Sequence, residues 1–254
     1  MIARLGVGIN AYIRALGSGV FMLGVNGHGA SGIYFLFGVH VVKTVSVTNA
    51  REPNQGIVAL DVEGVLIPEI WIAVAERTGI EALKRTTREE PDYDKLMLGR
   101  LEILRTHGLT MSLIEEVISA LKPFAGAKEF LDSIRSKYQV ILLSDTFEQF
   151  ARPFMRQLGM PTVFCHRLIV KGDAIDDYEL RQVNQKQKAV EAFRSLNYRV
   201  VAAGDSYNDT TMLGAATKGF LFRAPTNVIA EFPEYPAYTT YQELESAIDA
   251  VLGE

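Results

Sequence analysis

The stretch Ile57-Val58-Ala59-Leu60-Asp61-Val62-Glu63-Gly64 decides the fold of this chain. Its first four residues form an apolar run that is typical of a strand buried on both faces of a sheet. The run ends at Asp61, and a second carboxylate, Glu63, follows two residues later. In open parallel sheets, ligands bind outside the carboxyl ends of the strands, so both carboxylates lie where a functional site is expected.

Two further apolar runs end in the same way. Residues 140–143 precede Ser144-Asp145-Thr146, and residues 200–203 precede Gly204-Asp205-Ser206-Tyr207-Asn208-Asp209. Helical patterns separate the runs, which predicts an α/β fold: a mostly parallel sheet with helices on both faces. Because parallel strands end at the same edge of a sheet, we expect these polar groups to share one site.

The remaining periodicity predicts the other elements of the fold. Helices are expected over 69–83, 92–107, 126–137, 147–158, 186–196, 208–216 and 241–252. A further helix is expected to begin at Ser112, because Ser112 and Glu115 have the spacing of a capping box. Strands are expected over 57–60, 140–143, 162–165, 200–203 and 219–222, and a hairpin around Lys171-Gly172-Asp173.

The spacing between the first two motifs predicts a second domain. Asp61 and Ser144 are separated by 83 residues (144 − 61), more than a single crossover needs. The intervening stretch 69–122 has a helical pattern and is predicted to be a cap domain. The core domain is then formed by residues 56–68 and 123–254. Such a cap typically encloses a small substrate away from water.

Residues 1–55 differ in composition from the rest of the chain. They contain nine of the 21 glycines and a single acidic residue, Glu52. Their apolar stretch, 32–42, is much shorter than the roughly 20 residues that span a bilayer. The glycine-broken pattern predicts no helix or strand of useful length, so we expect a poorly ordered N-terminal extension. A targeting or membrane-touching role is the alternative.

Charge and cysteine content exclude several classes of function. The formal net charge is −4 and no basic tract is present, so we expect no nucleic-acid partner. A membrane partner is disfavoured by the shortness of the apolar stretch and remains only as the alternative for residues 1–55. Cys165 is the only cysteine, which excludes an internal disulfide and a cysteine metal site. A reducing cytoplasm fits this cysteine usage.

The carboxylates suit phosphoryl transfer. Asp61, at a strand end, can attack phosphorus and form an aspartyl-phosphate. Glu63 can protonate the leaving oxygen and then deprotonate the attacking water. Asp205 and Asp209, four residues apart at the start of a helix, can hold Mg²⁺ together with Asp61 and Glu63, because Mg²⁺ prefers oxygen ligands.

Other polar groups can bind the transferred phosphate. The hydroxyls of Ser144 and Thr146 can donate to phosphate oxygens, and Asn208 can contact the phosphate or steady its own loop. A lysine can supply a fixed positive charge; Lys186 is the candidate, with Lys188 as its rival. Each motif alone also fits a helix cap, a turn or a solvated surface charge, so the prediction depends on all four occurring in order.

The four motifs in this order resemble those of the haloacid dehalogenase-like superfamily, and the resemblance covers residues 57–252. It implies a parallel α/β core, an aspartyl-phosphate intermediate and Mg²⁺. Within the superfamily, the chain resembles the phosphoserine phosphatase branch. That resemblance implies that Glu69 binds the substrate ammonium and Arg100, on a helix of the cap, its carboxylate. Asp145 would belong to the phosphate-binding motif. Members of the branch often form dimers, so a homodimer is left open.

Two departures from ordinary phosphoserine phosphatases narrow the resemblance. Glu63 stands where aspartate is usual, and Ser144-Asp145-Thr146 where Ser-Gly-Gly is common. Both departures are shared with bifunctional members that also transfer the phosphoryl group from phosphoserine to homoserine. The alternatives are a hydrolase for another small phosphomonoester and, from a different class, a non-catalytic binding module. The second alternative predicts a lost nucleophile or metal ligand, and none is lost.

Overall fold

The computed structural model describes residues 55–87, 89–90 and 92–253 in full, and five strands before residue 43 by their backbone. The chain divides into two compact units, Met1–Pro53 and Asn54–Glu254. The first unit contains a five-stranded antiparallel sheet in the order β1-β2-β3-β4-β5. Its strands are β1 (Ile2–Arg4), β2 (Ile9–Ala15), β3 (Val20–Gly27), β4 (Ala30–Phe37) and β5 (His40–Val42).

These strands correct one expectation for residues 1–55. The prediction that the segment contains no strand of useful length is wrong, because β2, β3 and β4 have 7, 8 and 8 residues. The pairing runs from Val20 opposite Phe37 to Gly27 opposite Ala30, and it includes several glycines. Glycine weakens an isolated strand, but pairing with neighbours supplies hydrogen bonds that local sequence does not reveal. That the segment forms a poorly ordered extension stays a prediction.

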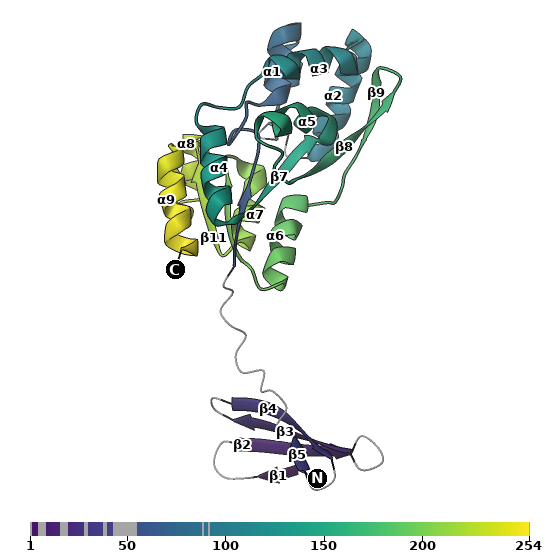
Figure 1. Ribbon diagram of the computed structural model, residues 1–254. Coiled ribbons are helices and arrows are strands. Elements are labelled where there is room, and N and C mark those ends of the chain that lie inside the picture. Colours follow the sequence, from purple (N-terminus) through teal and green to yellow (C-terminus); the bar gives the residue numbers. More distant parts are fainter. Residues whose placement is uncertain are drawn as a thin grey trace. The chain divides into compact units, whose positions relative to one another are not determined.

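The second unit is built on a seven-stranded sheet in the order β12-β11-β10-β6-β7-β8-β9 (Figure 1). All neighbouring pairs are parallel except β8 and β9, which form an antiparallel hairpin. The strands are β6 (Gly56–Leu60), β7 (Gln139–Phe147), β8 (Val163–Lys171), β9 (Ala174–Glu179), β10 (Arg199–Gly204), β11 (Lys218–Phe222) and β12 (Ala237–Tyr238). The predicted α/β fold is therefore confirmed.

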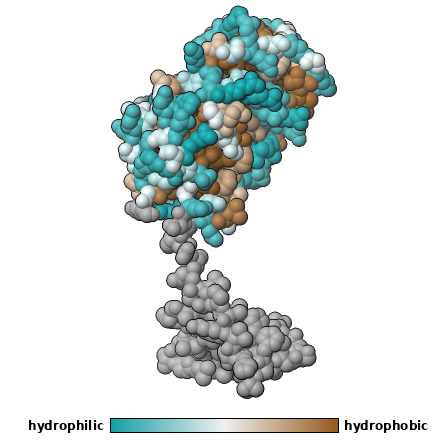
Figure 2. Space-filling model, viewed as in Figure 1, coloured by the Kyte–Doolittle hydropathy of each residue, from teal (hydrophilic) through white to brown (hydrophobic). Residues whose placement is uncertain are grey.

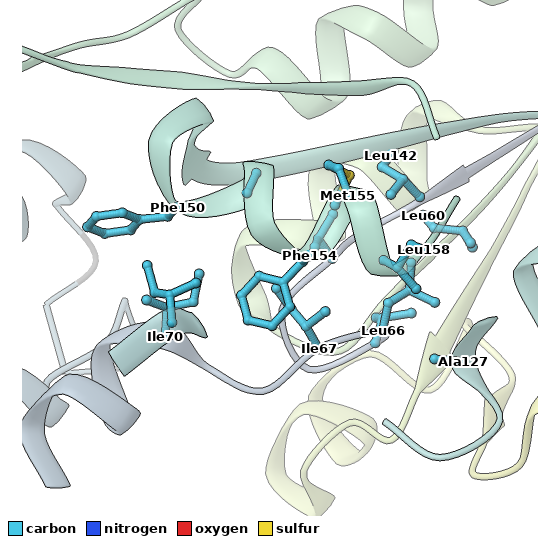
Figure 3. Packing of buried hydrophobic residues seen from close by; sticks show 14 of the residues in the cluster. Leu60, Leu66, Ile67, Ile70, Ala127, Leu142, Phe150, Phe154, Met155 and Leu158 are labelled. Carbon is cyan, nitrogen blue, oxygen red and sulfur yellow. The ribbon is translucent and has the colours of Figure 1, made fainter. Parts of the chain in front are cut away.

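Helices cover both faces of this sheet. One face carries α4 (Ala127–Lys137), α5 (Glu148–Gln157) and α9 (Tyr241–Leu252), and the other α6 (Gln185–Ser195), α7 (Thr210–Ala215) and α8 (Thr226–Glu231). Alternate strand residues serve the two faces: Val58 and Leu60 pack in one hydrophobic cluster, Ile57 and Ala59 in the other. Figure 3 shows the ring of Phe154, on α5, beside Ile67, in the segment between β6 and α1. The alternation explains why the strands read as continuous apolar runs.

The connection between β6 and β7 is helical, as predicted. It contains α1 (Ile70–Thr78), a short 3₁₀ helix η1 (Glu81–Lys84), α2 (Tyr93–His107) and α3 (Met111–Ala120). These helices lie beyond the carboxyl-terminal end of the sheet in Figure 1. The single helix expected over 69–83 is interrupted at Gly79, whose φ of 71° is the left-handed conformation of a helix C-terminus.

The start of α3 also differs from the prediction. Thr110 is the N-cap, and its Oγ1 accepts a hydrogen bond from Leu113 N at 3.3 Å. Ser112 does not cap the helix; its N and Oγ donate to Asp173 Oδ1 at 2.8 and 2.9 Å. Asp173 lies in the turn of the β8–β9 hairpin, so the capping-box spacing of Ser112 and Glu115 was coincidental.

The β8–β9 hairpin joins the sheet to the helical insertion. Besides the contacts of Asp173, Asp176 O accepts a hydrogen bond from Arg105 Nη2 at 2.8 Å, and Tyr178 Oη donates to Asp94. Its turn, at Gly172 with φ of 62°, confirms the predicted hairpin. Among the residues described, no helix is both long and apolar enough to cross a membrane. On the visible face of the second unit, hydrophilic residues predominate and hydrophobic ones form small groups (Figure 2).

Candidate active site

The predicted strand-end groups meet at one edge of the sheet. Asp61 follows β6 directly, and its backbone N donates to Ala203 O of β10 at 2.9 Å. On the other side of β6, strand β7 continues through Ser144, Asp145 and Thr146, where its register with β8 shifts between Leu143 and Phe147. Such an irregularity re-aims side chains next to a site. It explains why this motif lies within a strand rather than after it.

Three carboxylates form a cluster that fits a divalent cation. Asp61, Asp205 and Asp209 each offer an oxygen, and these atoms all lie within 4.8 Å of one another. All three residues are buried. Such an all-oxygen, strongly negative donor set suits Mg²⁺. Glu63, predicted as a fourth ligand, is not in this cluster, and its role as a ligand stays a prediction.

Two glycines allow the carboxylates to approach the backbone. A Cβ on Gly204 would lie 2.3 Å from Cγ of Asp209, and one on Gly64 would lie 2.5 Å from Cγ of Asp205. Asp209 Oδ2 accepts hydrogen bonds from the backbone N of Asp205 and of Ser206, at 3.0 and 3.1 Å. The glycines of the first and last motifs are therefore part of the site geometry.

Lys186 lies at the centre of the negative charge. Its Nζ is 2.8 Å from Oδ1 of Asp61, 2.8 Å from Oδ1 of Asp209 and 3.6 Å from Oδ2 of Asp145. Burial alone would lower the pKa of Lys186, but these carboxylates raise it well above its usual range. Lys188, the rival candidate, is exposed on the same helix. The structure brings Lys186, and not Lys188, to the cluster.

The raised pKa of Asp61 indicates that the site has room for additional positive charge. Burial raises the pKa of Asp61 well above its usual value, and the charges of Asp209 and Asp205 raise it further against the effect of Lys186. A nucleophilic carboxylate must be ionised. A divalent cation in the cluster would favour the ionised form, so the electrostatics agree with the donor set.

The second motif lines the space beside Asp61. Ser144 and Thr146 are buried, and Thr146 N donates to Ser144 Oγ at 3.2 Å. Asp145 Oδ2 accepts a hydrogen bond from Asn208 Nδ2 at 2.9 Å. Burial would raise the pKa of Asp145, but Lys186 and hydrogen-bond donors hold it well below its usual range. Asp145 is thus an anion at every physiological pH.

Glu63 reaches from the strand end to the helical insertion. Its Oε2 accepts a hydrogen bond from Ile70 N, at the start of α1, at 2.9 Å. Burial, followed by the nearby charge of Glu69, raises the pKa of Glu63 to about 8, although the Ile70 N–H opposes the shift. A carboxyl group with such a pKa can donate a proton near neutral pH, as an acid–base catalyst must. Glu69 occupies the N-cap of α1 without a side-chain capping bond.

Arg100, on α2, is buried in the insertion with one guanidinium nitrogen unused. Its Nη2 donates to Arg85 O at 2.8 Å, and its guanidinium lies 4.7 Å from the ring centre of Trp71. Burial lowers the pKa of Arg100 to about 10, so it stays charged at neutral pH. Within the described part of the chain, Nε of Arg100 is the one buried side-chain polar atom without a hydrogen-bond partner. A buried, unpaired donor of this kind calls for an acceptor.

Apart from Asp209, the candidate site residues line one cavity of about 410 Å³, between the sheet edge and the helical insertion. The site residues predicted from the sequence that line it are Asp61, Glu63, Glu69, Arg100, Ser144, Asp145, Thr146, Lys186, Asp205 and Asn208. Asp209 lies directly behind them, bonded to Lys186.

Several residues of the site were not identified from the sequence. Tyr93 lines the cavity, and its hydroxyl donates to Asp145 O at 2.8 Å. The helical spacing of Tyr93 from Arg100, seven residues, could have indicated a shared face. His166 and Gln185 are buried beside Asp145. No local pattern marks them, because β8 and α6 bring them together only in the folded chain.

Comparison with known proteins agrees with this geometry. A family model described as haloacid dehalogenase-like hydrolase matches residues 55–217. The phosphoserine phosphatase of Pseudomonas syringae pv. tomato is 60% identical over 190 residues, 74% of this chain and 80% of that protein. Phosphoserine phosphatase ThrH of Pseudomonas aeruginosa is 60% identical over 190 residues, covering 74% of this chain and 93% of that protein.

Solved structures show the same fold. A phospho-aspartyl intermediate analogue of a phosphoserine phosphatase aligns with a TM-score of 0.65 and 21% identity, covering 76% of this chain and 99% of that one. A substrate-bound phosphoserine phosphatase aligns with a TM-score of 0.65 and 21% identity, covering 76% and 98%. The family match, the relatives and the four motifs at one sheet edge agree: the chain belongs to the haloacid dehalogenase-like hydrolase family.

Proposed function

We propose that this protein is a phosphoserine phosphatase, which hydrolyses O-phospho-L-serine to L-serine and phosphate. The observation that carries the proposal is the buried guanidinium of Arg100, whose Nε has no hydrogen-bond partner, on a residue that lines the same cavity as the candidate nucleophile Asp61. A guanidinium favours a carboxylate partner, and the substrate carries one. Glu69 supplies the opposite charge for the substrate ammonium. The phosphoserine phosphatases among its relatives support the same substrate.

The proposed reaction has two balanced steps. An oxygen of Asp61 attacks phosphorus, the bond from phosphorus to the serine oxygen breaks, and protonated Glu63 gives its proton to that oxygen. Water then attacks the aspartyl-phosphate, Glu63 takes a proton from the water, and the bond from phosphorus to Asp61 breaks. Lys186 holds positive charge beside the phosphoryl oxygens in both steps.

Mg²⁺ fits the cluster of Asp61, Asp205 and Asp209. When bound there, it would supply positive charge that neutralises the phosphoryl oxygens. The carboxylates of this chain would fix its position, and Asp209 would be held in turn by Lys186 and by two backbone N–H groups.

We also propose that the helices between residues 69 and 122 act as a cap domain. Trp71 and Arg100 contact each other and line the cavity with Asp61, so the insertion supplies the groups that recognise the non-reacting part of the substrate. Such a division lets caps vary substrate choice while the core keeps the chemistry.

Homoserine is proposed as a second phosphoryl acceptor. The basis is the glutamate at position 63 and the Ser-Asp-Thr motif at 144–146, which resemble the bifunctional members of the branch. Glu63 is one methylene longer than aspartate, which alters how its carboxyl meets water or an alcohol. If Glu63→Asp leaves the ratio of phosphohomoserine to free phosphate unchanged, this explanation is wrong.

Product analysis tests the reaction. Protein, L-phosphoserine, Mg²⁺ and homoserine are incubated together, beside an Asp61→Asn control in which we expect turnover to fall by at least about 10³-fold. Phosphate and phosphohomoserine, both absent in the control, would support both activities. Phosphate alone would support the phosphatase activity and contradict the transfer to homoserine. No turnover of phosphoserine would contradict the substrate assignment.

Substitution of Arg100 distinguishes a phosphoserine phosphatase from a hydrolase for another small phosphomonoester. We expect Arg100→Ala to lower kcat/KM for phosphoserine about 10- to 100-fold, the value of a charged hydrogen bond. Turnover of a phosphomonoester without a carboxylate should change much less. Arg77→Ala is the matched control, because Arg77 is an exposed residue of the same insertion paired with Glu116. Equal losses on both substrates would favour the alternative.

A further inference from the structure

Four groups face the carboxylate of Asp145, two on each oxygen: Asn208 and Gln185 donate hydrogen bonds to it, and Lys186 and His166 lie 3.6 Å away. Oδ2 accepts from Asn208 Nδ2 at 2.9 Å and lies 3.6 Å from Lys186 Nζ. Oδ1 accepts from Gln185 Nε2 at 3.2 Å and lies 3.6 Å from Nε2 of His166. The first pair belongs to the phosphate-binding groups. The second pair lies behind the site and has no part in the proposed reaction.

The position of the His166 proton follows from its other nitrogen. Nδ1 of His166 accepts a hydrogen bond from the backbone N of Arg181 at 3.1 Å, so Nδ1 carries no proton. The ring proton is therefore on Nε2, the nitrogen that faces Asp145. The ring is buried and packs against Tyr93 and Phe147, with centroid distances of 5.8 and 6.4 Å, so it cannot turn to solvent.

The orientation of Gln185 excludes another acceptor for that proton. Its Oε1 accepts from Arg181 Nε at 3.0 Å, and its Nε2 donates to Ser144 O at 2.5 Å. With the amide so fixed, Nε2 of Gln185 is a donor, and the 3.2 Å between it and Nε2 of His166 joins two donors. Both N–H groups therefore converge on Oδ1 of Asp145.

We propose that His166 is a positioning residue of the active site: its Nε2–H, with the amide of Gln185, fixes the carboxylate of Asp145, which in turn orients Lys186 and Asn208 toward the phosphoryl group. This inference rests on the proposed phosphoryl transfer at Asp61. Three elements meet at this carboxylate: β7 contributes Asp145, β8 His166 and the start of α6 Gln185. Fixed partners of this kind make the charge of a site effective, because it need not reorganise during reaction.

The tautomer can be tested in the unaltered protein. Long-range ¹H–¹⁵N spectra of protein labelled in its four histidines should show neutral His166 with a protonated Nε2 and an unprotonated Nδ1. The signal is assigned as the one that remains when His28, His40 and His107 are each replaced. A proton on Nδ1 would overturn the proposal. This test does not depend on which phosphomonoester is the substrate.

A double-mutant cycle tests whether His166 acts through Asp145. His166→Phe replaces the imidazole with another aromatic ring and removes both nitrogens, and we expect it to lower kcat about tenfold with a small change in KM, because a partner that orients a site residue is lost. Asp145→Asn should lower kcat at least as much. The double variant should be no slower than Asp145→Asn alone, because the coupling is lost once the carboxylate is gone.

Three outcomes of the cycle would overturn the proposal: additive losses, an unchanged kcat in His166→Phe, or an unchanged kcat in Asp145→Asn. His107→Phe is the matched control and should keep full activity, because His107 is exposed at the end of α2. If His166→Phe does not fold, the spectra decide. If the protein does not turn over phosphoserine, the proposed function fails, and the cycle is measured with the small phosphomonoester that it hydrolyses.

Discussion

At the scale of single residues, Gly204 is the position in the site where an added side-chain atom would approach a neighbour most closely. A Cβ there would lie 2.3 Å from Cγ of Asp209, too close for any rearrangement short of moving that carboxylate. We predict that Gly204→Ala lowers kcat/KM by at least about 100-fold, because Asp209 is a candidate metal ligand and anchors Lys186. Steady-state kinetics at saturating Mg²⁺ measure this.

The control for this substitution is Gly99→Ala. Gly99 is exposed within α2 and has no atom within 4 Å of an added Cβ. Alanine there should leave kcat/KM unchanged and stabilise the protein by up to about 1 kcal/mol, the difference in helix propensity. Equal activity in both variants would show that the Gly204 contact does not matter.

A second prediction at this scale concerns the single cysteine. Burial, then the charge of Glu148, raises the pKa of Cys165 to about 11, against a smaller effect of Arg181. The neutral thiol therefore predominates at pH 8, and the thiolate fraction there is on the order of 10⁻³. We expect alkylation by iodoacetamide, followed by mass spectrometry, to be slow at pH 8 and to accelerate about tenfold per pH unit up to about pH 11. Labelling as fast as that of free glutathione at pH 8 would contradict it.

Residues at strand ends could be predicted from the sequence, and their supporting residues could not. Asp61 and Asp205 follow apolar runs, and the order of motifs then favoured Lys186, with Lys188 left as its rival. Tyr93 and His166 reach the site only through the packing of α2 and β8 against β7. Such contacts depend on tertiary geometry, which no periodicity within one segment records.

At the scale of elements, the β8–β9 hairpin anchors the start of α3. Asp173 accepts hydrogen bonds from Ser112 N and Oγ, which lower its pKa. We predict that Asp173→Ala lowers the Tm at pH 7 by about 2 °C, as loss of one surface anchor would. Thermal unfolding followed by circular dichroism measures the change.

The pH dependence of this effect has a definite sign. Because the folded state lowers the pKa of Asp173, its stabilisation is present above the unfolded pKa, about 3.9, and is lost as the pH falls through the folded value. The difference in Tm between the wild type and Asp173→Ala should therefore shrink below about pH 4. A difference that is constant from pH 7 to pH 3 would show that the charge of Asp173 contributes nothing.

The elements differ in how well local sequence determines them. The last helix was predicted as observed, Tyr241–Leu252, because Thr240 and Glu243 form a true capping box at its start. The same spacing at Ser112 and Glu115 failed, because the Ser112 hydroxyl bonds to the hairpin instead. A capping pattern is therefore informative only where no tertiary partner competes for the hydroxyl.

At the scale of the whole molecule, metal binding should be linked to stability. Asp61 follows β6, while Asp205 and Asp209 follow β10, so a cation among them joins two segments of the chain. At about 100 times its dissociation constant, Mg²⁺ should add about 2.7 kcal/mol, or roughly 5–10 °C in Tm. Asp205→Asn should remove most of this increment, and EDTA should abolish activity until Mg²⁺ is restored. An equal increment in Asp205→Asn would place the cation elsewhere.

The division of the chain into two units leads to a last prediction. Residues 54–254 contain their own hydrophobic clusters, the full set of site residues and the whole family match. The first residues of this unit are also bonded to the sheet, because Arg199 N donates to Gln55 O at 3.2 Å, next to β6. We therefore predict that a shortened chain of residues 54–254 folds and keeps kcat/KM for phosphoserine within about twofold of the full chain. Side-by-side kinetics and thermal unfolding test this. A loss of activity with an unchanged Tm would mean that the first unit contributes to catalysis. A fall in both would mean that the second unit depends on the first for folding.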